Sequence, residues 1–106
     1  MMIGQLAILG ALAFVQNMAF TWVSRSRNSG DPNYHRRAAW CSNTVWFLTN
    51  SLMFSIMTPI INGERGWGWL IPTFFVYGLA TAEGSVFMMK RLLKTETGKR
   101  KVGAAA

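Results

Sequence analysis

Residues 2–23 read MIGQLAILGALAFVQNMAFTWV and contain no Lys, Arg, Asp or Glu. A helix rises about 1.5 Å per residue, so this run is long enough to cross the roughly 30 Å hydrocarbon core of a bilayer. Two further runs share the property: residues 40–61 are uncharged, and residues 67–89 carry only Glu83. The sequence therefore predicts an all-α membrane protein with three transmembrane helices, at 2–23, 40–61 and 67–89.

The segments between and after these spans are short. They are an inner loop at 24–39, an outer turn at 62–66 and a basic tail at 90–106. None of them is long enough to enclose a core of its own, so residues 1–106 are expected to form a single membrane domain. The five-residue turn predicts that the second and third spans form an antiparallel hairpin.

The basic residues are unevenly distributed between the two sides of the predicted membrane domain. Ten of the 11 Lys and Arg residues lie in 24–39 and 90–101, whereas the opposite side has only Arg65. Because cytoplasmic flanks retain Lys and Arg, we expect the N-terminus outside and the C-terminus inside, in a bacterial inner membrane. The positions of the tryptophans agree with the predicted ends of the spans, since indole side chains favour membrane interfaces. They are Trp22 and Trp40 on the inner side and Trp67 and Trp69 on the outer side.

The same placement of charge explains the net charge of +7 without a nucleic acid partner. We expect the basic flanks to contact anionic lipid head groups. The predicted contacts are Arg25, Arg27, Arg36, Arg37, Lys90 and Arg91. Cys41 is the one cysteine, and no catalytic motif or metal-ligating set is evident, so no enzyme activity, cofactor or metal is expected.

Five polar side chains are expected within the inner half of the spans. Glu83 precedes Lys90 by seven residues, which places it about 10 Å inside the boundary, and four amide side chains lie at similar depths. The predicted intramembrane polar cluster is Gln16, Asn17, Asn43, Asn50 and Glu83. One interpretation is structural, with interhelical hydrogen bonds that set helix register. The other is functional, with Glu83 facing water or carrying a proton or cation.

Small residues recur on single faces of the second and third spans. In the second span, four hydroxyl residues follow one another at intervals of seven, four and three residues, which places them on one face of the helix. This face either packs closely against another helix or lines an aqueous path. This stripe is Thr44, Ser51, Ser55 and Thr58. In the third, two pairs at a spacing of four residues indicate helix association. These pairs are Gly78 with Ala82 and Ala80 with Gly84.

This layout resembles the three-span phage holins, which have an external N-terminus, a tight outer hairpin and a basic cytoplasmic tail. The arginine-rich inner loop departs from that layout. The resemblance implies a small protein that forms homo-oligomers in the inner membrane and opens lesions during phage lysis. Glu83 and the Thr44–Thr58 stripe would then supply the wetted faces.

Two other functions fit the same residues. An accessory subunit would use its Gly and Ala faces to dock on a larger membrane protein. A small homo-oligomeric transporter would use Glu83 as a coupling residue, because three spans rarely enclose a substrate path alone.

Overall fold

The computed structural model describes residues 2–95 and is built from helices. They are α1 (Met2–Ser26), α2 (Pro32–Ile61), the short 3-10 helix η1 (Trp67–Trp69) and α3 (Leu70–Thr95). Residues 2–26, 32–61 and 67–94 are each long and apolar enough to cross a membrane. This confirms the all-α class and gives three helices that are long and apolar enough to span a membrane, as a multi-pass membrane protein requires.

The helices extend beyond the predicted spans. α1 continues to Ser26 and α2 begins at Pro32, so most of the segment predicted as the inner loop is helical. α3 likewise includes Lys90 and Arg91, whereas the tail residues 96–106 lie outside the described residues. The basic side chains therefore project from helix ends.

The α1–α2 connection is short, and one of its residues accepts hydrogen bonds from the free backbone N–H groups at the start of α2. The Asp31 side chain accepts hydrogen bonds from the backbone N–H groups of Asn33 and Tyr34, at 3.1 and 3.2 Å. Pro32 follows as the first helical residue, where its missing N–H costs nothing. Gly30 has φ +75°, a left-handed conformation that glycine adopts without strain.

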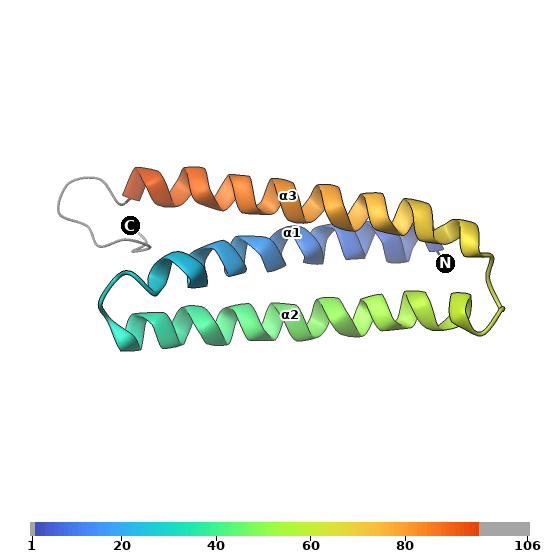
Figure 1. Ribbon diagram of the computed structural model, residues 1–106, viewed down its shortest axis with the longest axis horizontal. Coiled ribbons are helices and arrows are strands. Elements are labelled where there is room, and N and C mark those ends of the chain that lie inside the picture. Colours follow the sequence, from blue (N-terminus) through green and yellow to red (C-terminus); the bar gives the residue numbers. More distant parts are fainter. Residues whose placement is uncertain (1, 96–106) are drawn as a thin grey trace.

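The central helix of the molecule is α1 (Figure 1). It packs against both α2 and α3, whereas no Cα atom of the described α2 lies within 8 Å of one in α3. The second and third spans are antiparallel, as predicted, but α1 separates them. We call the end with residues 27–31 the loop end, and the end with Met2 and residues 62–66 the turn end.

The backbones of α1 and α3 approach closely at Gly84. A Cβ atom at this position would lie 2.2 Å from the backbone oxygen of Phe14. At Gly78, in contrast, an added Cβ would have no neighbour within 4 Å. Of the two predicted small-residue pairs, the one containing Gly84 therefore brings α1 and α3 together.

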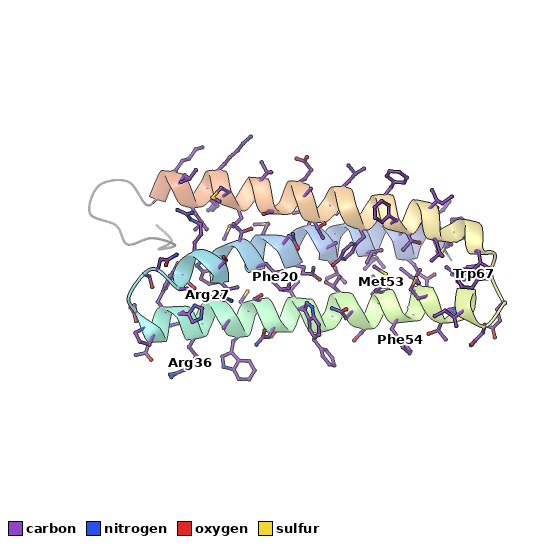
Figure 2. All side chains as sticks on the ribbon, viewed as in Figure 1. Phe20, Arg27, Arg36, Met53, Phe54 and Trp67 are labelled. Carbon is purple, nitrogen blue, oxygen red and sulfur yellow. The ribbon has the colours of Figure 1, made fainter. Side chains whose placement is uncertain are left out.

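The main apolar core lies toward the turn end. Met2, Leu9 and Ile56 are buried there, and the half-buried Met53 and Tyr77 pack against them. Figure 2 shows Met53 between α1 and α2, while Phe54 points away from the helices. The Phe54 side chain is 74% exposed, and many other large apolar side chains are also exposed, each to a smaller fraction. An apolar surface of this extent is suited to contact with lipid.

Candidate functional site

The hydroxyl stripe lies on the face of α2 that points away from α1. Ser42, Thr49 and Ile56 recur every seven residues and are buried against the neighbouring helix. Thr44 and Ser51 each follow one of these residues by two positions, about 200° around the helix. Thr44, Ser51 and Ser55 are exposed and Thr58 is half-buried. Within one chain the stripe is thus not used for packing on α1.

The stripe hydroxyls donate to the backbone of their own helix. Those of Thr44, Ser51 and Thr58 each bond the carbonyl oxygen four residues earlier, at 2.8 Å. This bond satisfies the donor and lowers the cost of placing a hydroxyl in hydrocarbon. The oxygen lone pairs stay accessible to a donor from outside the chain.

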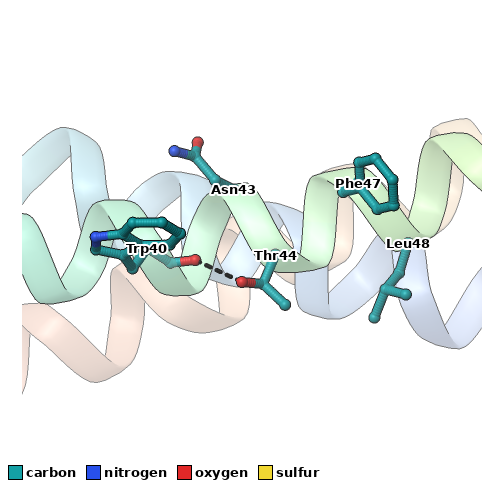
Figure 3. Close-up of a pocket in the computed structure, with 5 residues that line it drawn as sticks. All are labelled: Trp40, Asn43, Thr44, Phe47 and Leu48. Atoms are coloured by element: carbon teal, nitrogen blue, oxygen red, sulfur yellow. Dashed lines mark hydrogen bonds between the residues drawn. The ribbon is translucent and has the colours of Figure 1, made fainter.

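Two amides extend this polar face. Asn43 and Asn50 are both exposed on α2, and the Asn50 side chain donates to the Trp46 carbonyl oxygen at 2.8 Å. Asn43 borders a shallow outward cavity of about 320 Å³ (Figure 3). Its other lining residues are Trp40, Thr44, Phe47 and Leu48. We define the outer polar face of α2 as Asn43, Thr44, Asn50, Ser51, Ser55 and Thr58.

Gln16 and Asn17 lie in a different place, at the interface of α1 with α3. The Gln16 Nε2 atom donates to Asn17 Oδ1 at 3.3 Å and to the Tyr77 hydroxyl at 3.1 Å. Gln16 is only 2% exposed, and its Oε1 atom has no hydrogen-bond partner among the described residues. The five polar residues predicted to cluster are therefore divided. Gln16 and Asn17 form one group, and Asn43 and Asn50 lie on the outer face of α2.

The fifth of them, Glu83, is exposed on α3, next to the Gly84 contact. Its side chain does not take part in the hydrogen bonds that join Gln16, Asn17 and Tyr77. The five residues were predicted to lie at similar depths in the membrane, but similar depth does not mean that their side chains point toward one another.

Three polar residues that the sequence reasoning missed help to join α1 to α3. Tyr77 is a partner of Gln16, and the Thr21 and Ser85 hydroxyls lie 2.9 Å apart. Tyr77 precedes Gly84 by seven residues, which places both on the same face of α3. That spacing was a usable signal for Tyr77, whereas no periodic pattern in the sequence pairs Thr21 with Ser85.

The side chains predicted to contact lipid gather at the loop end. Arg27, Arg36, Arg37, Lys90 and Arg91 are exposed there, and Arg25 is half-buried. Figure 2 shows Arg36 projecting outward from α2. This end therefore has the charge needed to bind lipid phosphates.

At the turn end, the single arginine of the outer turn has partners within the chain. The Arg65 Nη1 atom lies 3.2 Å from the Gln5 Oε1 atom and 3.0 Å from the Met2 sulfur. The two ends of the molecule thus differ in charge as the sequence indicates.

The described residues contain no group of three His, Cys, Asp or Glu side chains placed to hold a metal ion. The features that remain as a candidate site are the outer polar face of α2, the exposed Glu83 and the buried Gln16 group. Comparison of the chain with protein-family models, curated proteins and solved structures finds no match.

Proposed function

We propose that the chain is a small inner-membrane protein that assembles into homo-oligomers and permeabilises the membrane in the manner of a phage holin. The observation that carries this proposal is the outer polar face of α2. It lies on a helix long and apolar enough to span a membrane and is mostly exposed, with Asn43 at its edge also lining the cavity between α1 and α2.

Such a face is poorly matched to lipid alone. Hydrocarbon offers no partners for hydroxyl and amide groups, so these groups favour contact with another polar surface or with water. Hydrogen bonds between transmembrane helices contribute about 0.6–2 kcal/mol each. The Asn43 and Asn50 amides of a second copy supply donors for the hydroxyl lone pairs, and this favours association through the outer polar face.

The exposed apolar surface extends over all three helices: on α2, Phe47, Phe54 and Ile61 are exposed among the polar groups. Exposed side chains on α1 and α3 include Ile8, Val15, Phe74 and Leu79, which suit contact with acyl chains. In a ring of copies, α2 would face inward and these apolar faces outward. Separation of the α2 helices would then admit water along their polar faces, whereas Glu83, on α3, lies outside this path.

Orientation and location are part of the proposal. The basic loop end faces the cytoplasm and anionic lipid, with the N-terminus outside. The membrane is the bacterial inner membrane. We propose no enzymatic role and no nucleic acid partner.

The test is membrane potential and culture density after induced expression in a bacterium. We expect growth to continue for a time and then stop abruptly with depolarisation. The variant Ser51→Leu/Ser55→Leu replaces part of the outer polar face with apolar bulk, so it should abolish the depolarisation. The matched control Ala82→Leu/Val86→Leu adds leucines at exposed positions of α3, and it should depolarise as the parent does.

Sustained growth at normal potential, with the parent protein present in the membrane, would contradict the holin-like proposal. Stable copurification with a larger membrane protein would then favour an accessory subunit that docks through the same face. Saturable uptake that Glu83→Gln abolishes would favour a homo-oligomeric transporter.

A further inference from the structure

An opening at the loop end lies between α1 and α3. It forms a cavity of about 380 Å³ whose lining is largely polar. Asn17, Thr21, Ser24 and Asn28 line it from α1 and the start of the connection, and Ser85 lines it from α3. A second cavity, of about 420 Å³, lies beside it between α1 and α2 and shares Phe20 and Ser24 with the first. The loop end is thus hollowed on both sides of α1.

From this opening, polar groups continue inward along the α1–α3 interface. The Thr21 and Ser85 hydroxyls lie 2.9 Å apart across the interface. Asn17 follows Thr21 one helical turn deeper, and its Oδ1 atom accepts a hydrogen bond from Gln16 at 3.3 Å. Gln16 in turn bonds Tyr77 on α3. Asn17, which lines the opening, therefore connects it to Gln16, which itself lines neither cavity.

Gln16 needs a partner that these residues do not supply. It is 98% buried, and its Oε1 atom accepts no hydrogen bond from the described residues. Turning the amide over does not remove the deficit, because one end of the group would still face Asn17 and Tyr77 and the other would still lack a partner. A buried polar group without a partner destabilises the folded chain, and a bound water molecule removes that cost.

The charge at the opening selects among small polar ligands. Arg25 lines the cavity between α1 and α3, and Arg27 lines its neighbour. None of the residues that line either cavity is acidic. Positive charge at the mouth of a narrow path disfavours the entry of cations, whereas neutral water is not repelled.

Beyond Gln16 the interior becomes apolar. Ala13 and Leu9 lie one and two turns toward the turn end, and both are 0% exposed. Gln16 itself is nine residues from Arg25, or about 13 Å along the helix, which is nearly half of a hydrocarbon core. We propose that each chain contains a hydrated half-channel, in which water enters between α1 and α3 at the loop end and binds Gln16. This inference concerns a single chain and does not depend on oligomers or lesions.

The test uses single cysteines in a Cys41→Ser background, in protein reconstituted into lipid nanodiscs so that both ends are accessible. A small, membrane-impermeant sulfonate reagent reacts with the thiolate form of cysteine, so it modifies only thiols that are in contact with water and can ionise. Asn17→Cys lies in the proposed half-channel, and the control Val15→Cys lies two residues away on an exposed apolar surface. We expect Asn17→Cys to be modified at least about ten-fold faster, because only its thiol would be hydrated.

A second pair of cysteine variants, on α3, shows whether the result at Asn17 is only a local effect of that substitution. Ser85→Cys faces the proposed water path, and Val86→Cys is its exposed apolar neighbour. The same preference is expected. Equal rates within both pairs, in variants with the parent's helix content by circular dichroism, would overturn the half-channel.

The innermost water is tested without any substitution. In isotopically labelled parent protein, magnetisation transfer between water and the Gln16 side-chain amide protons is expected. Its absence, with such transfer seen at the exposed Asn28 side chain, would overturn the binding of water at Gln16. Because none of these measurements involves depolarisation, failure of the half-channel and failure of the holin-like proposal are distinguishable.

Discussion

The turn end and the loop end of the molecule are built from the same three helices but differ in what lies between them. At the turn end, Met2, Leu9 and Ile56 form an apolar core that η1 and Tyr77 help to cover. At the loop end, α3 stands apart from α1 in Figure 1, and cavities flank α1 on both sides. The apolar core cluster thus lies at the turn end, whereas cavities open beside α1 at the loop end.

The largest expected effect is at the contact that divides these two regions. Gly84→Ala would bring a Cβ atom within 2.2 Å of the Phe14 backbone oxygen, so α1 and α3 must separate. We expect a loss of more than about 2 kcal/mol, at the upper end of the cost of overpacking. Thermal unfolding in detergent measures it. Gly78→Ala, which has open space, is the control and should be neutral or slightly stabilising.

A cavity in the turn-end core should have the next largest effect. Leu9→Ala removes a fully buried side chain, and we expect a loss of about 2 kcal/mol, chiefly from packing that is not replaced. Chemical unfolding in mixed micelles measures it. Ile8→Ala truncates a neighbour that is 55% exposed and should change stability little. Equal losses for the two variants would show that the turn end is not a packed core.

A change at the boundary between the regions should have a smaller effect. Gln16→Leu removes the hydrogen bond to Tyr77 but also removes a buried acceptor that has no partner among the described residues. Because these two contributions oppose each other, we expect a net change below about 1 kcal/mol. The same unfolding experiment measures it. A loss of several kcal/mol would mean that the Gln16 group is a main structural element, as important as the core.

The smallest effect is expected inside the loop end. The Thr21–Ser85 hydrogen bond crosses from α1 to α3 at 2.9 Å. A double-mutant cycle with Thr21→Val and Ser85→Ala should give a coupling free energy near 0.6 kcal/mol, the average for such bonds between transmembrane helices. A coupling free energy indistinguishable from zero would indicate that water already competes for these hydroxyls.

Several features of the candidate site could be predicted from the sequence, and others could not. The depths of Gln16, Asn17, Asn43, Asn50 and Glu83 follow from their distance along the chain from charged residues. Their facing does not, because rotation of a helix about its axis depends on which neighbour it packs against. The hydroxyl stripe shows the same limit: its periodicity is visible in the sequence, but nothing there says that it points away from α1.

What the sequence by itself determined is the set of three membrane-spanning helices and the difference in charge between their ends. Hydrocarbon thickness sets the length of an apolar run, and the exclusion of charge from lipid leaves Lys and Arg at its ends. Only the tertiary structure decided that α1 is central, that Gly84 meets Phe14 and that Gln16 is buried beside Tyr77. These features depend on side-chain fit between segments far apart in the chain, which no local pattern of hydropathy encodes.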